Sequence, residues 1–175
     1  MCSGIVTAQQ YFTVVVGTFL DAKSNDFNEI KRYGLVYAYQ LDGNLSKIYL
    51  GGFDDKARAD RVVASLRERG YTNAFTQERH LNEGKTVTVI QMATRYIEKD
   101  IEWEKFSEYG QLYAILNDNK VKVLTGIFPS VDAAKQKLAE IKRTWYKDAF
   151  IKKVNSALLV NISEVETGIK KPLMP

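Results

Sequence analysis

The chain repeats its own pattern of residues at a spacing of 75 positions. Residues 12–16 align with 87–91, and after one residue is gained in the second copy, Tyr33-Gly34 aligns with Tyr109-Gly110. One residue is lost in the following turn. The match then continues through six pairs, in which Ala59, Val63, Leu66, Tyr71, Ala74 and Phe75 fall on Ala134, Leu138, Ile141, Tyr146, Ala149 and Phe150. A match over the whole copy, with both length changes where loops are expected, predicts that one folding unit is present twice.

Each copy carries the same order of strand and helix signals. The first copy begins with a β-branched run that predicts a strand (11–16), followed by apolar residues at every third position that predict a helix (27–33). Two further strands flank Asp42-Gly43, which is hairpin-turn chemistry. Asp55 can cap a second helix that Gly70 ends, and a short strand follows. The order predicts an α+β fold of two tandem β-α-β-β-α-β modules, each a four-stranded antiparallel sheet with two helices on one face (ferredoxin-like).

The repeat divides the chain into five segments. They are a terminal segment (1–10), a first module (11–79), a linker (80–84), a second module (85–154) and a C-terminal extension (155–175). The linker is short and polar, which predicts that the modules contact each other. The extension contains an apolar run, 157–162, that predicts an extra strand; we expect it to pair with a sheet edge, because an unpaired apolar strand promotes association. An interaction tail is the alternative.

Composition argues against several kinds of site. Cys2 is the only cysteine and His80 the only histidine, which excludes an internal disulfide and a structural zinc site. No apolar run approaches the ~20 residues of a membrane-spanning helix. No glycine-rich phosphate loop precedes a helix, and the acidic residues over 98–104 resemble a solvated helix start rather than a catalytic pair. We therefore expect no catalytic site, no metal and no cofactor. The net charge of +4 suits an acidic polymer, but it suits an ordinary soluble domain as well.

The first ten residues, MCSGIVTAQQ, resemble neither a helix nor a strand. Val6-Thr7-Ala8 fits the small-residue pattern ahead of a signal-peptidase cleavage, which predicts the remnant of an export signal and a periplasmic location. Two alternatives stay open. Cys2-Ser3 would be the lipidated start of a mature lipoprotein, or the segment is a flexible terminus without a targeting role.

Short motifs punctuate the first copy in a specific order. Its opening strand runs into Gly17-Thr18-Phe19, its hairpin ends in Leu50-Gly51-Gly52-Phe53, and Gly70-Tyr71 leads to Ala74-Phe75. This order resembles the SPOR (sporulation-related repeat) domain of bacterial cell-envelope proteins. The second copy keeps Gly126-Ile127-Phe128, but Gln91 to Thr94 lacks the glycine and the aromatic residue of the first motif. The resemblance covers about residues 11–154.

The resemblance implies a non-enzymatic protein that binds peptidoglycan, often as glycan strands stripped of stem peptides, on the helix-free face of its sheet. Carried over by position, the groove residues are Val15, Thr18, Leu45, Lys47 and Phe75 in the first copy and Ile90, Ala93, Lys120, Lys122 and Phe150 in the second. Period-two alternation adds Tyr49, which shares a face with Lys47 and can stack on a sugar ring. Where the family favours a glutamine, this chain has Val15 and Ile90.

Other interpretations compete with glycan binding. Apolar side chains on open sheet faces favour a scaffold subunit of an envelope or outer-membrane protein complex, or two sheets that cover each other. The residues concerned are Val15, Ile90, Leu124 and Phe150. RNA-recognition modules share the order of elements, but the chain lacks their aromatic motif, so no nucleic acid is expected as a partner. Finally, the alignment with the resembled family leads us to expect that Tyr37 and Tyr39 point inward and belong to the core.

Overall fold

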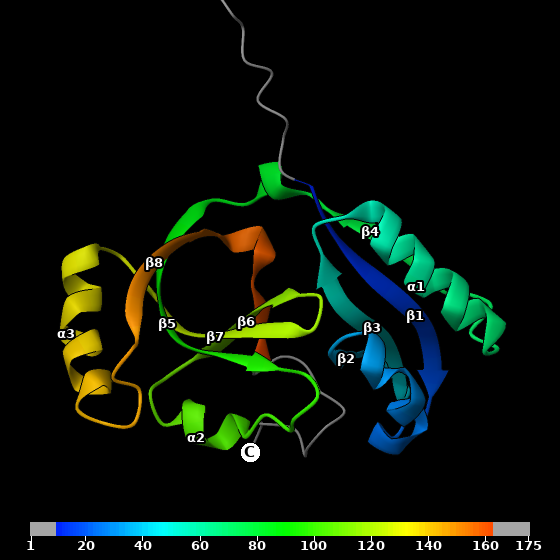
Figure 1. Cartoon of the computed structure of the whole chain (residues 1–175), viewed down its shortest axis with the longest axis horizontal. Helices are drawn as coiled ribbons and strands as arrows, with labels where there is room; N and C mark the ends of the chain where they lie inside the picture. Colours follow the sequence, from blue (N-terminus) through cyan, green and yellow to red (C-terminus); the bar gives the residue numbers. More distant parts are fainter. Residues whose placement is uncertain (1–9, 163–175) are drawn as a thin grey trace, which may run out of the picture.

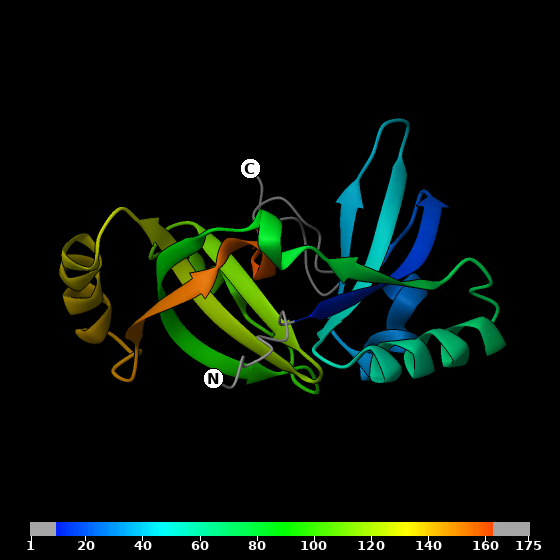
Figure 2. The same ribbon diagram turned by 90° about the horizontal axis from the view of Figure 1, so that it is seen from above.

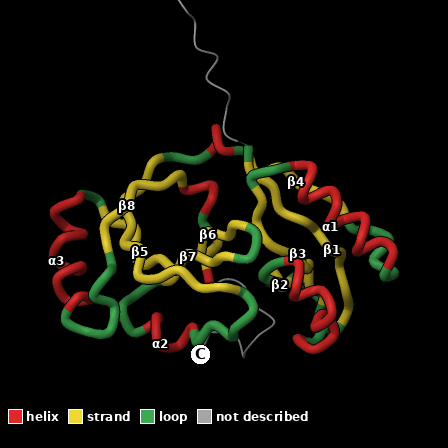
Figure 3. The backbone as a smooth tube through the Cα atoms, viewed as in Figure 1, coloured by secondary structure: helices red, strands yellow, loops and turns green. Residues whose placement is uncertain are grey.

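A computed structural model of the chain describes residues 10–162, and these form an α+β structure with two antiparallel sheets (Figure 1). The export-signal remnant, Cys2 and the end of the extension (163–175) lie outside the described residues. The two sheets stand side by side, with helices α1 and α3 at opposite ends of the molecule (Figures 1 and 3). None of the helices in the described range has the length and apolarity needed to cross a bilayer.

The first sheet has four strands in the order β2-β3-β1-β4. Its elements are β1 (Tyr11–Leu20), the 3-10 helix η1 (Ser24–Tyr33), β2 (Val36–Gln40), β3 (Leu45–Phe53), α1 (Lys56–Glu68) and β4 (Phe75–Arg79). Asp55 caps α1 by accepting a hydrogen bond from the backbone N–H of Ala57. η1 is not the α-helix that the sequence led us to expect: apolar residues at every third position match the three residues per turn of a 3-10 helix.

The second sheet has five strands in the order β8-β5-β7-β6-β9. Its elements, with the short helix before it, are η2 (Leu81–Glu83), β5 (Thr86–Tyr96), α2 (Trp103–Ser107), β6 (Leu112–Asn117), β7 (Lys120–Phe128), α3 (Val131–Lys142), β8 (Phe150–Asn155), η3 (Ser156–Leu158) and β9 (Val160–Asn161). The fifth strand comes from the extension, and Val160 pairs with Ala114 of β6. The expected edge pairing is confirmed, over a shorter strand than 157–162.

Alternate residues of each sheet face the helices. In the first sheet Phe12, Val14 and Val16 of β1 pack with residues of η1 and α1. In the second sheet Ile90 and Met92 of β5 pack with residues of α2 and α3. Each sheet thus buries one face under helices and leaves the other helix-free.

The strand registers of the two sheets correspond position by position. Val15 lies opposite Tyr49 in the first sheet, and Gln91 lies opposite Leu124 in the second. Val15 therefore corresponds to Gln91. The sequence had led us to expect Ile90 at this position, and that expectation is wrong. The residue gained in the second copy lies before β5, not between its first strand and its helix. The sequence alignment of the two first strands was wrong by one position.

The two halves are in direct contact (Figure 2). The Tyr11 hydroxyl donates a hydrogen bond to the carbonyl of Leu116, and the backbone N–H of Asp118 donates to the carbonyl of Gly52 at 2.7 Å. A Cβ on Gly52 would approach the Leu116 carbonyl oxygen to 2.6 Å, so this close approach requires glycine. Leu35 and Tyr37 of the first half are buried in the same apolar cluster as residues of the second half.

Candidate functional site

The predicted residues of the first copy meet on the helix-free face of the first sheet. Tyr49 lies opposite Val15, Lys47 lies opposite Thr18, and Phe75 pairs with Val15 from the other side. Leu45, two residues before Lys47, is partly exposed at the end of β3. Val15 itself is buried, so it supports the face and cannot contact a ligand directly. The ligand roles of the others stay a prediction.

Three tyrosines form a packed cluster on this face. The rings of Tyr37 and Tyr49 stack with centroids 5.4 Å apart, and Tyr39 meets Tyr49 edge-on at 5.5 Å. In β2, Val36 and Ala38 face the helices of the first sheet, not the tyrosines. The expectation of a core position is confirmed for Tyr37, which is buried beneath the second half, whereas Tyr39 is only half-buried.

A groove of about 520 Å³ runs across this face beside the tyrosines. Its lining residues are Thr13, Tyr39, Gln40, Leu41, Lys47, Tyr49, Gln77 and Arg79. Lys47 and Tyr49 were singled out from the sequence, and the Lys47 ammonium lies over the Tyr49 ring at 5.4 Å from its centroid. Gln77 and Arg79 were missed, although period-two alternation from Phe75 would have placed both on the same face.

Arg79 is held in the groove by a hydrogen bond to a neutral group. Its Nη2 donates to the Tyr37 hydroxyl at 3.1 Å, and that hydroxyl lies 3.3 Å from the hydroxyl of Thr13. The Nε of Arg79 is buried and has no hydrogen-bond partner among the residues that the structure describes. Burial disfavours the charged guanidinium, but the electrostatic interaction and hydrogen bond with Tyr37 outweigh it and raise the pKa of Arg79. The arginine therefore stays charged and keeps one unsatisfied donor.

The second sheet offers a different set of residues on its helix-free face. Ile90, predicted there, is fully buried beneath the helices, and Gln91 takes its place. Gln91 is 8% exposed; its Nε2 donates to the Thr94 hydroxyl at 3.3 Å, and its Oε1 has no partner. Lys122 is half-buried and Phe150 is 46% exposed on the same face.

One further predicted position and one new lysine complete this face. Lys120 is exposed, with its ammonium 5.7 Å from the centroid of the Tyr96 ring. The prediction for Ala93 is wrong: Ala93 pairs with Val123 and packs in the cluster beneath the helices, and Thr94, opposite Lys122, takes its place. Lys152 pairs with Val89 and was not singled out from the sequence. Burial lowers the pKa of Lys152, and the nearby charge of Lys122 lowers it further. The part of this face that carries Lys120, Lys122 and Lys152 is therefore cationic.

The remaining, apolar part of the same face is covered by the segment that follows β8. Leu158 and Leu159, which follow β8, pack against an apolar cluster on β5, β6, β7 and β8. Its buried members are Val87, Val89, Ile115, Leu124 and Val154. Leu124, expected to mark an exposed interface, is 0% exposed. Its apolar character is explained by cover from the C-terminal segment.

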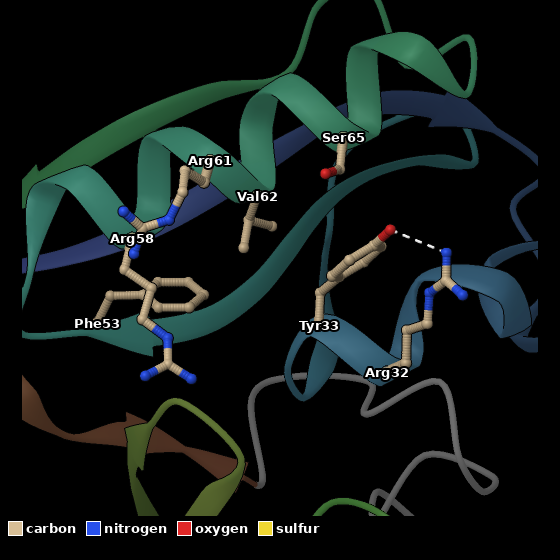
Figure 4. Close-up of a pocket in the computed structure, with 7 residues that line it drawn as sticks. All are labelled: Arg32, Tyr33, Phe53, Arg58, Arg61, Val62 and Ser65. Carbon is tan, nitrogen blue, oxygen red and sulfur yellow. Dashed lines mark hydrogen bonds between the residues drawn. The ribbon is translucent and has the colours of Figure 1, made fainter.

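A smaller cavity of about 280 Å³ lies on the helix side of the first sheet (Figure 4). Arg32, Arg58 and Arg61 line it, together with Tyr33, Phe53, Val62 and Ser65. The Arg58 guanidinium pairs with the Asp118 carboxylate at 3.1 Å. A hydrogen bond from Arg69 lowers the pKa of Tyr33, and one from Arg32 acts in the same direction. The cavity can attract anions, but its arginines extend into solvent and no sequence pattern singled it out.

Comparison with models of known protein families and with curated proteins found no match to this chain. Within residues 10–162, no group of three or more histidine, cysteine, aspartate or glutamate side chains is placed to hold a metal ion. The functional assignment therefore depends on the two helix-free faces.

Proposed function

We propose that this chain is a non-catalytic protein of the bacterial envelope that binds peptidoglycan glycan strands on the helix-free faces of two tandem β-α-β-β-α-β modules. The observation that carries the proposal is the groove beside Tyr49, where aromatic rings and hydrogen-bonding side chains line one open sheet face. Its periplasmic location rests on the export-like sequence of the first ten residues alone.

The groove provides the two kinds of contact that a sugar polymer needs. The Tyr49 ring stacks on Tyr37 with one face and can offer the other, beside the Lys47 ammonium, to the apolar face of a pyranose ring. Gln77 can both donate and accept hydrogen bonds, the Thr13 hydroxyl likewise, and Lys47 can donate to acetamido carbonyls. The groove that offers these contacts has a volume of about 520 Å³.

Residues at corresponding positions of the second sheet support the same function. Gln91 stands where the resembled family favours a glutamine, and its unpartnered Oε1 can accept a hydrogen bond from a sugar hydroxyl. Thr94, Lys122 and Phe150 surround it on the same face. The shared strand registers also support the duplication, and Gly51 and Gly126 occupy corresponding positions with positive φ angles of 62° and 68°.

A protein-binding scaffold is the second candidate function. The observation that favours it is the exposure of Phe75 and Phe150, which are 45% and 46% exposed at corresponding positions of the two sheets. Exposed aromatic side chains are enriched at protein interfaces. Co-purification of a stoichiometric envelope protein that Phe75→Ser and Phe150→Ser release would favour this function.

Retention on purified sacculi tests the glycan proposal. The whole chain is mixed with intact sacculi and with sacculi stripped of stem peptides by an amidase, and the bound fraction is measured after sedimentation. We expect the chain to be retained on at least the stripped sacculi. Tyr49→Ala removes one stacking ring and should weaken this binding about tenfold, which corresponds to ~1.4 kcal/mol of binding free energy. Trp145→Ala is the matched control, because Trp145 is 94% exposed and lies beside residues of α2, on the helix side of the second sheet. No retention on either preparation would rule the proposal out.

A further inference from the structure

Arg79 brings a positive charge into the groove without an acidic partner. Its guanidinium is half-buried, its Nη2 is bound to a phenol, and its Nε has no partner. None of the ion pairs among the described residues includes Arg79. A charged group withdrawn from water is costly unless an opposite charge or a full set of hydrogen bonds compensates it. In this groove the compensation is incomplete.

A second cation faces the same space. The Lys47 ammonium lies over the Tyr49 ring, and it takes part in none of the ion pairs among residues 10–162. Among residues 10–162, no aspartate or glutamate lines the groove. The groove therefore has two positive charges from its lining residues, and nothing in the described part of its lining neutralises them.

The second sheet has no cation at the position that corresponds to Arg79. Val154 occupies the position in β8 that Arg79 occupies in β4, and Leu158 and Leu159 cover the apolar cluster to which Val154 belongs. Only the first sheet has an arginine at this position, and it lies at the end of β4, where the groove is open. A simple solvated surface charge does not account for its burial among three tyrosines.

We propose that the groove recognises a carboxylate on its ligand, with Arg79 as the anchor and Lys47 as the second cation. The planar fork of a guanidinium matches the two oxygens of a carboxylate, and such charge-assisted hydrogen bonds are short and strong. This inference rests on the proposed function for the rest of the ligand, an amino sugar whose ring stacks on Tyr49. The sugar of a glycan strand that bears a carboxylate is N-acetylmuramic acid, through its lactyl ether, and this group is free once the stem peptide has been removed.

A pair of monosaccharides isolates the carboxylate. N-acetylmuramic acid and N-acetylglucosamine differ by the lactyl group, and each is titrated into the whole chain while the Arg79 Nε–H and Gln77 side-chain amide signals are followed by NMR. We expect N-acetylmuramic acid to shift the Arg79 signal and to bind about tenfold more tightly, the effect of one charge-assisted hydrogen bond. Equal affinity for the two sugars, or no binding of either, overturns the inference.

Variants assign the effect to the named residues. Arg79→Gln should remove the preference for the acidic sugar, so that the two sugars bind with equal affinity. Because Arg79 also holds Tyr37, Lys47→Gln serves as a second variant outside that contact, and it should reduce the preference in part. Arg143→Gln removes one positive charge from an exposed site at the end of α3 and is the matched control. An equal loss of preference in Arg143→Gln would attribute the effect to net charge and overturn the assignment.

The sacculus assay separates this inference from the proposed function. Retention on sacculi whose carboxylates have been reduced to alcohols, equal to that on untreated sacculi, overturns the carboxylate inference and supports glycan binding. Preference for free N-acetylmuramic acid without any retention on sacculi supports the carboxylate inference and rules out binding to the glycan strands of the sacculus.

Discussion

Truncation of Leu124 measures whether the C-terminal segment truly covers the apolar part of the helix-free face of the second sheet. Leu124 is 0% exposed and packs in the cluster to which Leu158 and Leu159 belong. Leu→Ala at a fully buried site costs ~2–5 kcal/mol, depending on how far the surroundings collapse. The covering residues come from a short segment that can move inward, so we expect Leu124→Ala to lower the free energy of unfolding by about 3 kcal/mol. For a chain of this length that is roughly 6–12 °C in Tm.

Urea unfolding followed by tryptophan fluorescence reports on this half directly. Both tryptophans lie in the second half, and Trp103 is buried whereas Trp145 is exposed, so the change in emission comes from Trp103. Phe150→Ala on the same face is the control, and its partial exposure predicts a cost of about 1 kcal/mol or less. A double-mutant cycle between Leu124→Ala and Leu159→Ala should give a coupling of at least ~0.5 kcal/mol.

Two results would refute the reasoning. If Leu124→Ala costs no more than a surface substitution, about 0.5 kcal/mol, the segment does not cover the sheet in solution. If the cost is large but the coupling to Leu159→Ala is zero, something other than this segment covers Leu124. The expectation from the sequence that Leu124 lies at a protein interface would then be supported.

Three further predictions concern other parts of the molecule. Gly52→Ala should lower stability by several kcal/mol, because its Cβ would collide with the other half, and thermal unfolding measures it; a change below ~1 kcal/mol would contradict the contact. Arg69→Gln should raise the pKa of Tyr33, because the hydrogen bond that lowers it is lost, and the pH dependence of the Tyr33 ring carbon shifts shows the change. Lys122→Gln should raise the pKa of Lys152 by removing a like charge, as followed by NMR of the lysine side chain. Because the folded-state pKa of Lys152 lies below its unfolded value, the charged form destabilises the fold at neutral pH, and this penalty is relieved as the pH rises through the folded pKa.

An α+β fold with antiparallel sheets could be predicted from the sequence, because strand and helix signals depend on local periodicity. Asp55 and Ser130 cap α1 and α3 as their positions indicate. The type of the first helix could also have been inferred, since Phe27, Ile30 and Tyr33 at every third residue match a 3-10 helix better than an α-helix.

The position of the length change before β5 could not be predicted in the same way. Val87 to Ile90 aligns with the first copy about equally well in two registers, because β-branched residues occur at every position. A shift of one residue moves every side chain of a strand to the opposite face. The site prediction therefore failed at Ile90 and overlooked Gln91.

Tyr37 shows what local patterns cannot reveal. The side chain is buried, as an apolar ring in a strand suggests, but it is buried by the other half of the chain and not by the helices of its own half. Only the contact between the halves decides this, and no periodicity encodes it. Arg79 was overlooked for a related reason: a charged residue at a strand end is normally solvated, and its enclosure depends on the same tyrosines.

The burial of Leu35 and Tyr37 among residues of the second half has a consequence for cooperativity. A polypeptide cut within η2 would leave both side chains facing water in one fragment and an uncovered apolar patch in the other. Neither fragment would be expected to persist as a monodisperse monomer. We therefore expect the two halves to unfold together, so that a mutation that destabilises one half also destabilises the other.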